Sequence, residues 1–219
     1  MRDPSRLVGI HFFNPVAQME LVEVVQGQAT TPLIMQQACA FVVQISKLPL
    51  MVKSNPGFLI NRVLMPYLLE AVVLLDEGYT NERIDMAVKD FGMLMGPITL
   101  MDTIGLDVCL AVAQQLVKYF GGTVPERLQT MVNNKHLGCK SGQGFYHYKH
   151  GKAVKKKIKS EDKDKVLAAR LMQKIIDESQ ACIQENVVAD ADLLDAGMVF
   201  ATGFAPFRGG PLHYRDNAK

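Results

Sequence analysis

The sequence predicts a mainly helical protein that opens with the last part of an α/β domain. Strand-like runs come early, at Leu7–Phe13, Glu20–Val25 and Leu48–Lys53, and "GCKSGQGFYHY" (Gly138–Tyr148) reads as a glycine turn leading to a short extended end. From Asn55 onward, apolar residues recur with the spacing of amphipathic helices. These helices fall into two sets that resemble each other, so two related all-α domains are expected after the α/β segment.

The α/β segment reads as incomplete. A helix is expected from Pro32 to Ile45, with Thr31 as its N-cap and proline in the first helical position. Strand, helix and strand in this order are typical of an α/β sheet. Three strands and one helix leave too many edges and faces uncovered for an independent domain. Residues 1–55 are therefore interpreted as the carboxy-terminal part of a larger α/β domain.

The helical part divides at a charged linker. We expect a long helix from Asn55, as its cap, to about Glu77, within a first all-α domain over residues 56–148. Residues 149–160 are interpreted as a linker, and residues 161–219 as a second, shorter helical repeat. The other expected helices are Asn81–Phe91, Ile98–Phe120, Pro125–Asn133, one from about Glu161 to Glu185, and Ala191–Phe200.

The two helical sets share a pattern that favours a duplication. "EAVVLLDEGYTNERIDMAVKDFG" (residues 70–92) resembles "ESQACIQENVVADADLLDAGMVF" (residues 178–200). Each has a long helix, a short acidic loop and an amphipathic helix ending in Phe, and each is followed by a Gly-Pro pair, Gly96-Pro97 or Gly210-Pro211. A duplication explains this pattern, although two unrelated helical hairpins could share it by chance.

The composition fits a globular protein without a strong charge bias. Of the 219 residues, 48% are hydrophobic and 21% are charged, which allows a buried core and argues against disorder. The net charge of +2 gives no strong preference for nucleic acid. The lysines of the stretch Lys149–Lys165 are followed at once by acidic residues, so a solvated linker is the simpler interpretation and a phosphate-rich partner is the alternative.

Other features favour a soluble, cytoplasmic protein. The opening "MRDPSRLVG" lacks the apolar core of a secretory signal. The longest apolar run, Phe58–Gly78, is interrupted by Arg62, Glu70 and Asp76, so a core helix is expected rather than a membrane span. The four cysteines form no CxxC pair, which favours free thiols in a reducing compartment, and no metal site is predicted.

One histidine and one glutamate are candidates for a catalytic pair. His11 lies in "GIHFF" and Glu23 in "ELVEVV", and their side chains could meet if the two strands pair across the short loop. A carboxylate beside an imidazole fixes its tautomer and makes it a competent general base. A structural histidine and, at Asn61 in its apolar helix, a structural amide remain open alternatives on spacing alone.

The motifs, taken together, identify a family resemblance. "GIHFFNPVAQMELVEVV" followed by "NPGFLINRVLMPYLLEA" resembles the NAD-dependent 3-hydroxyacyl-CoA dehydrogenases of fatty-acid β-oxidation, and this resemblance extends to about Tyr148. The second helical set and "GFAPFRGGPLHYRD" resemble the end of the multifunctional α-subunit, in which a hydratase/isomerase domain precedes the dehydrogenase and the helical domain is repeated. The resemblance implies that residues 1–55 are the end of an NAD-binding Rossmann domain.

The resemblance implies catalytic and substrate-binding roles. His11 matches the base that takes the proton of the substrate 3-hydroxyl while hydride leaves C3, and Glu23 matches the carboxylate that orients it. Asn61 matches a residue that binds acyl-CoA near its thioester carbonyl. Tyr214 is matched to a substrate-contacting tyrosine of the second repeat.

The NAD site implied by the family is only partly recognisable. Asn14 matches a residue near the nicotinamide, and Lys140 matches a position that reaches the cofactor in some members. No G-x-G-x-x-G follows a strand, since "GQG" at Gly142–Gly144 leads into Phe145. The glycine-rich half of the Rossmann domain, the family's catalytic serine or threonine and a hydratase domain are not found, so the chain is interpreted as a carboxy-terminal fragment of a longer polypeptide.

Two hypotheses follow. In the first, the chain is a fragment of an enzyme with acyl-CoA as substrate, NAD as cofactor and a thiolase β-subunit as partner of the full-length protein. In the second, it is a non-catalytic helical interaction or dimerisation module. In either case a monomer is expected if the two helical sets pack as a pseudo-dimer, and a homodimer otherwise.

The 219-residue chain by itself is expected to bind NAD weakly or not at all and to leave 3-hydroxyacyl-CoA unoxidised. The reason is that it lacks the glycine turn that holds the pyrophosphate at a helix N-terminus. Calorimetric titration with NAD and the absorbance of NADH test this expectation. Micromolar affinity for NAD, or measurable NADH production, would contradict it.

Overall fold

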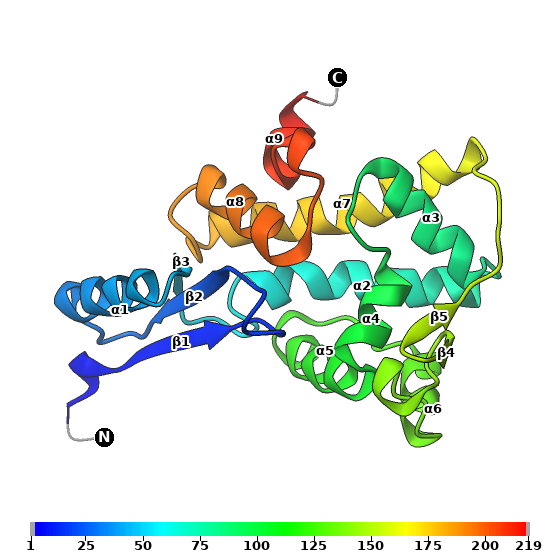
Figure 1. Ribbon diagram of the computed structural model, residues 1–219. Coiled ribbons are helices and arrows are strands. Elements are labelled where there is room, and N and C mark those ends of the chain that lie inside the picture. The colour runs from blue at the N-terminus through cyan, green and yellow to red at the C-terminus, as the bar shows by residue number, and fades with distance from the viewer. Residues whose placement is uncertain (1–2, 218–219) are drawn as a thin grey trace. The chain divides into compact units, whose positions relative to one another are not determined.

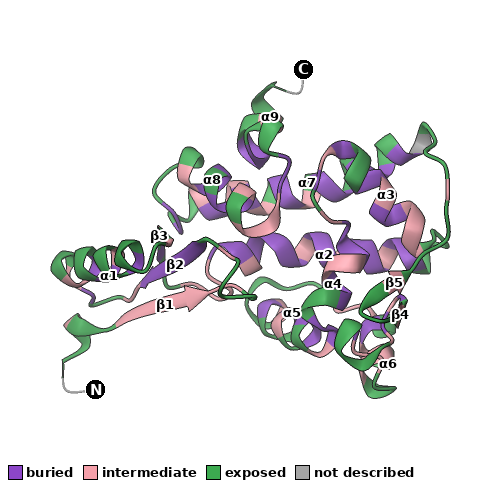
Figure 2. Cartoon of the chain, in the orientation of Figure 1, coloured by how far each residue is buried: buried purple, intermediate pink, exposed green. Residues whose placement is uncertain are grey.

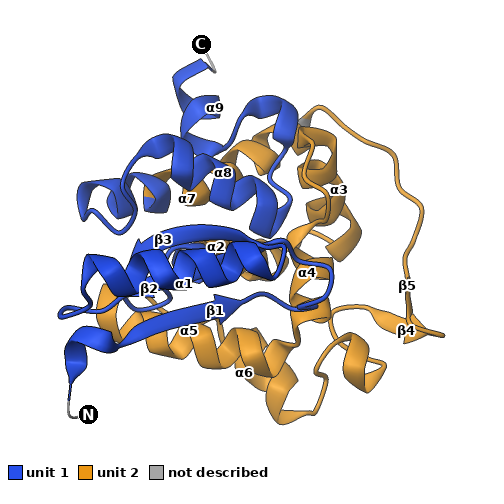
Figure 3. Ribbon diagram, turned by 60° about the vertical axis from the view of Figure 1, so that its left-hand side comes forward, with its two compact units in different colours: residues 1–62, 178–219 blue, residues 63–177 orange. Residues whose placement is uncertain are grey.

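The computed structural model describes residues 3–217, apart from the side chain of Lys163, and the chain divides into two compact units. Unit 1 combines Met1–Arg62 with Glu178–Lys219, and unit 2 is Val63–Asp177 (Figure 3). These units do not coincide with the four expected segments, whose boundaries stay a prediction.

The described residues are mostly helical, with a small sheet (Figure 1). The strands are β1 (Val8–Phe12), β2 (Leu21–Gln26), β3 (Leu48–Lys53), β4 (His147–Lys149) and β5 (Lys152–Val154). The helices are α1 (Pro32–Gln44), α2 (Ile60–Asp76), α3 (Asn81–Phe91), α4 (Pro97–Ile104), α5 (Leu106–Phe120), α6 (Glu126–Asn133), α7 (Lys163–Gln184), α8 (Ala191–Thr202) and α9 (Pro211–Asn217).

The three expected strands form one sheet in the order β1-β2-β3. β1 pairs with β2 in antiparallel orientation, and β2 pairs with β3 in parallel orientation. α1 connects the two parallel strands, as expected for an α/β unit. Thr31 occupies the N-cap position of α1, as expected, although its side chain makes no capping hydrogen bond.

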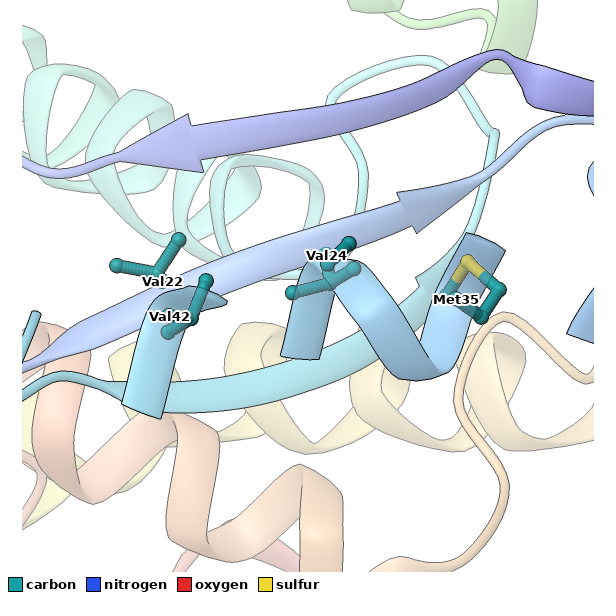
Figure 4. Close-up of a cluster of buried hydrophobic side chains, with 5 residues drawn as sticks. Val22, Val24, Met35 and Val42 are labelled. Atoms are coloured by element: carbon teal, nitrogen blue, oxygen red, sulfur yellow. The ribbon is translucent and has the colours of Figure 1, made fainter. Parts of the chain in front are cut away.

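The central strand β2 is buried on both faces. Val22 and Val24 project from one face onto α1, where they pack against Met35 and Val42 (Figure 4). Because side chains alternate along a strand, Glu23 projects from the opposite face, and it is also closed to solvent. Figure 2 shows buried residues along β2 and much of α2. Burial on both faces is typical of an inner strand of an α/β sheet.

Two helix boundaries differ from the sequence-based expectation. α2 begins at Ile60 rather than after Asn55, because Gly57 and Phe58 have left-handed φ angles of 76° and 51° and form a turn. The single helix expected over Ile98–Phe120 is broken into α4 and α5, which are bent by 100°. Gly105, with a φ of 104°, makes that break possible.

No single helix within residues 3–217 is both long and apolar enough to cross a membrane. α4 and α5 meet the length and hydropathy requirements only as a bent pair. α2 is a core helix, as expected, since residues such as Val63, Leu68 and Ala71 are fully buried.

The two helical sets contain the same capping arrangement. In unit 2, the Asp85 carboxylate of α3 accepts a hydrogen bond from the N–H of Ile98, at the start of α4, over 2.9 Å. In unit 1, the Asp195 carboxylate of α8 accepts one from the N–H of Leu212, at the start of α9, over 2.8 Å. The shared arrangement fits the predicted relation between the sets, and it places an acidic group at each helix N-terminus, where the backbone dipole favours it.

The glycine of each Gly-Pro pair is required by this arrangement. A Cβ atom added at Gly96 would lie 2.3 Å from Oδ1 of Asp85, and one added at Gly210 would lie 2.3 Å from Cβ of Asp195. Only glycine therefore allows the helix N-terminus to approach the buried carboxylate this closely.

Replacing Asp195 by alanine is expected to lower the free energy of unfolding by about 2–4 kcal/mol. The N–H groups of Leu212 and His213 lose their acceptor, and each unsatisfied buried donor costs about 1–3 kcal/mol. Part of this loss is offset, because burial raises the pKa of Asp195 and so makes its charged form costly. Urea unfolding measures the change. The control is Asp192→Ala, at an exposed position of the same helix, and equal stabilities of the two variants would contradict the capping role.

Candidate active site

The strand pairing brings His11 and Glu23 together in unit 1. The antiparallel register places the two residues directly opposite each other on β1 and β2. Nδ1 of His11 lies 2.7 Å from Oε2 of Glu23, which is a short, well-formed hydrogen bond. The side chains therefore meet, as the pairing across the short loop requires.

The Glu23 carboxylate is fully buried and uses both of its oxygens. Its side chain is 0% exposed, and Oε1 accepts hydrogen bonds from the N–H groups of Leu59 at 2.9 Å and Ile60 at 3.0 Å. These amides are at the beginning of α2, where backbone N–H groups have no partner within the helix. A buried carboxylate is costly unless hydrogen bonds replace the water that it loses, and here three such bonds do so.

This arrangement determines the tautomer of His11. Both oxygens of a carboxylate are acceptors, so Nδ1 must carry the ring proton and donate a hydrogen bond to Glu23. Nε2, on the other side of the ring, then carries the lone pair. The His11 side chain is 31% exposed, unlike its partner. The pair can therefore accept a proton at Nε2 and stabilise the resulting imidazolium with the carboxylate at Nδ1.

Two aromatic rings restrain the imidazole. The ring centres of Phe13 and Phe58 lie 4.9 Å and 5.4 Å from that of His11, both in edge-on geometry. Phe58 belongs to the turn before α2, and it was not among the residues expected at the site. The Asn-Pro-Gly sequence before it is a turn signal that could have indicated its special position.

The other expected residues of unit 1 lie in three different segments. Asn61 is half-buried in the first turn of α2 and directly follows a residue whose amide binds Glu23. Asn14 is exposed in the loop that follows β1. Tyr214 is half-buried in α9, where the Arg208 guanidinium lies 5.1 Å from its ring centre. The substrate-contacting role of Tyr214 stays a prediction.

Lys140 belongs to unit 2 and is part of an ion pair there. Its Nζ lies 2.5 Å from Oδ1 of Asp107, and this hydrogen bond lowers the pKa of that carboxyl. The segment after Lys140 is anchored by Asp102, which accepts hydrogen bonds from the N–H groups of Phe145 and Tyr146, both at 2.9 Å. The cofactor role of Lys140 stays a prediction.

Comparison with known families gives a consistent assignment for the α/β segment and for the first helical set. Residues 1–55 match the family model described as "3-hydroxyacyl-CoA dehydrogenase, NAD binding domain". Residues 57–148 match the model "3-hydroxyacyl-CoA dehydrogenase, C-terminal domain". The chain belongs to the 3-hydroxyacyl-CoA dehydrogenase family. The resemblance seen in the sequence motifs is thereby confirmed, and with it the family's use of NAD.

Individual relatives of this dehydrogenase family member cover nearly all of the chain. The fatty acid oxidation complex subunit alpha of Shewanella putrefaciens is 37% identical over 227 residues, covering 97% of this chain and 32% of the relative. The dehydrogenase part of multifunctional enzyme 1 from C. elegans has a TM-score of 0.62 at 30% identity and covers 92% of this chain and 49% of that one. The chain thus spans about a third of the length of the curated relatives it matches.

The fold itself is shared with a further dehydrogenase structure. The 3-hydroxybutyryl-CoA dehydrogenase from Escherichia coli K12 has a TM-score of 0.83 at 24% identity, and the match covers 98% of this chain and 64% of that one. The second helical set, which lies beyond both matched family segments, is included in this shared fold.

Glu23→Gln is expected to reverse the tautomer of His11 while leaving the fold intact. If the side-chain oxygen of the new glutamine still accepts the hydrogen bonds of the Leu59 and Ile60 N–H groups, its NH₂ group faces Nδ1 of His11. An NH₂ group can only donate a hydrogen bond. The ring proton then moves to Nε2, which loses its capacity as a base. Nitrogen-15 NMR of the imidazole distinguishes the two tautomers. Retention of the proton on Nδ1 would contradict the assignment, and exposed Glu20→Gln serves as control.

Proposed function

We propose that this chain forms part of a multifunctional NAD-dependent (S)-3-hydroxyacyl-CoA dehydrogenase of fatty-acid β-oxidation, with His11 as its general base. The observation that carries the proposal is the His11–Glu23 pair, with Nδ1 bound at 2.7 Å and Nε2 directed away from the carboxylate. The family assignment and the alpha-subunit relatives support the reaction class.

The chemistry assigns each residue a distinct task. Nε2 of His11 takes the proton of the substrate 3-hydroxyl, and the O–H electron pair forms the carbonyl as hydride leaves C3. Glu23 stabilises the imidazolium and is itself fixed by the first amides of α2. Asn61, in the same turn of α2, has an amide that can donate a hydrogen bond to the thioester carbonyl and so orient the acyl chain.

NAD, when bound, accepts the hydride from C3. Asn14 suits the nicotinamide end of such a cofactor, because its exposed amide follows His11 by three residues in the loop after β1. Lys140 is a second proposed contact, from unit 2. The strands and helices described here include no glycine-rich turn that could hold the pyrophosphate, so we expect residues outside this chain to bind most of the dinucleotide.

The names of the relatives suggest a partner. An alpha subunit of a fatty acid oxidation complex implies a second type of subunit, and we propose that the full-length protein associates with a thiolase β-subunit that consumes the 3-ketoacyl product. Within the chain, Tyr214 of the second helical set is a proposed substrate contact. The four-segment division, with related helical domains at residues 56–148 and 161–219, belongs to the same proposal.

In a full-length polypeptide that contains this segment, His11→Gln is expected to lower kcat by about 10²- to 10⁴-fold with little loss of stability. The glutamine amide can still donate to Glu23, but it cannot take up a proton. NADH production from 3-hydroxyacyl-CoA measures turnover, and exposed His147→Gln is the matched control. Turnover within about twofold of the parent would exclude a base at His11 and would favour a non-catalytic interaction module.

A further inference from the structure

Arg62, next to Asn61 in α2, is held by two glutamates of the second helical set. Its Nε donates to Glu178 over 2.6 Å, and Nη1 and Nη2 donate to the two oxygens of Glu185 over 2.6 Å and 2.8 Å. Arg62 is only 2% exposed. We call these three residues the Arg62 clasp, and all of them lie in unit 1. Two-pronged Arg–carboxylate pairs of this kind are among the strongest and most directional side-chain contacts.

Unit 2 contains a counterpart, the Arg170 clasp. Arg170 donates to Glu70 over 2.6 Å and to both oxygens of Glu77 over 2.7 Å. Each member of the Arg62 clasp has its equivalent 108 positions away in the sequence (62 to 170, 70 to 178, 77 to 185). The arginine of each helical set therefore pairs with the two glutamates of the other set. The two clasps differ in burial, since the Arg170 side chain is 40% exposed.

Arg62 also forms hydrogen bonds with the turn that precedes α2. The backbone N–H of Arg62 donates to the carbonyl of Gly57 over 3.3 Å, and its Nη1 donates to Oδ1 of Asn55, also over 3.3 Å. The turn contains Phe58 in a left-handed conformation, with a φ of 51°. A bulky residue in this region is strained and persists only where its surroundings hold it.

This turn contacts both members of the catalytic pair. The Phe58 ring lies against His11, and the amides of the next two residues, Leu59 and Ile60, bind Glu23. The second helical set also reaches the end of the sheet, where the carbonyl of Val187 accepts a hydrogen bond from the N–H of Lys53 over 2.8 Å.

The charge balance supports the same arrangement. A cation in the first turn of a helix is unfavourable beside the positive end of the backbone dipole. Burial lowers the pKa of Arg62, but its hydrogen bonds to Glu185 and Glu178 outweigh that effect and raise the pKa overall. The hydrogen bond from Arg62 in turn lowers the pKa of Glu185. The two carboxylates therefore neutralise a charge that would otherwise destabilise the start of α2.

We propose that Glu178 and Glu185 are positioning residues for the His11–Glu23 pair, acting through Arg62 and the Asn55–Phe58 turn. The catalytic consequence rests on the proposed function, while the positioning can be measured without turnover. The second helical set thus helps to place a base that lies in the α/β segment.

The test compares Glu178→Gln/Glu185→Gln with the matched double variant Glu70→Gln/Glu77→Gln of the Arg170 clasp. Both remove two carboxylates from an equivalent clasp, but only the first removes them from Arg62. Hydrogen exchange in the 219-residue chain is expected to accelerate at least about tenfold at the Leu59 and Ile60 amides in the first variant, with less than about twofold change in the second. The NMR signal of the Nδ1 proton of His11 is expected to weaken only in the first. In the full-length polypeptide, kcat is expected to fall about tenfold in the first variant alone.

Equal acceleration of hydrogen exchange at Leu59 and Ile60 in the two variants would overturn the proposal. Such a result would mean that both clasps contribute only to the overall stability of the fold. Faster exchange with unchanged kcat would likewise overturn the positioning role. If the double variant does not fold, single Glu185→Gln, whose side chain is 47% exposed, gives the same comparison against Glu77→Gln. Loss of activity in His11→Gln is a separate result, so failure of the proposed function is distinguishable from failure of the clasp.

Discussion

The carboxylate of Glu23 is the group on which the site depends. It is completely buried, yet it accepts hydrogen bonds from an imidazole on the neighbouring strand and from two backbone amides at the start of a helix. A buried charge without partners would cost several kcal/mol, so sheet, helix and histidine must be assembled together. The same three hydrogen bonds that compensate for burial also determine the His11 tautomer. The Glu23 carboxylate therefore contributes both to the stability of the fold and to the orientation of the proposed base.

The helix start is the second constraint, and it carries a conformational cost. α2 begins only after Phe58 because that residue adopts a left-handed conformation, and the unusual turn aims two amides at Glu23. Strained residues of this kind are expected near functional sites, where the surrounding contacts hold them. Here the holding contacts come from Arg62 and, through it, from Glu178 and Glu185. A segment more than a hundred residues away in the chain thus contributes to the geometry of the imidazole.

Much of this organisation could be predicted from local sequence signals. The "ELVEVV" strand was located to within one residue because it is a short, mostly apolar run. The Pro32 helix start and the Asn81–Phe91 helix were located correctly because each has a clear period or cap. The His11–Glu23 contact followed from two short strands joined by a short loop. The start of α2 was misplaced because Asn55-Pro56 is equally good as a helix cap and as the beginning of a turn. The α4–α5 break was missed because Gly105 lies within a continuous apolar pattern. The clasps had no local signal, since Arg62 and its partners are separated by 116 and 123 residues.

The most direct test of the account is a crystal structure of a full-length polypeptide containing this segment, with (S)-3-hydroxyacyl-CoA bound. We expect the 3-hydroxyl oxygen within about 2.6–3.2 Å of Nε2 of His11, with the thioester carbonyl beside the Asn61 amide. An acyl chain bound elsewhere, with Nε2 facing only protein or solvent, would contradict it.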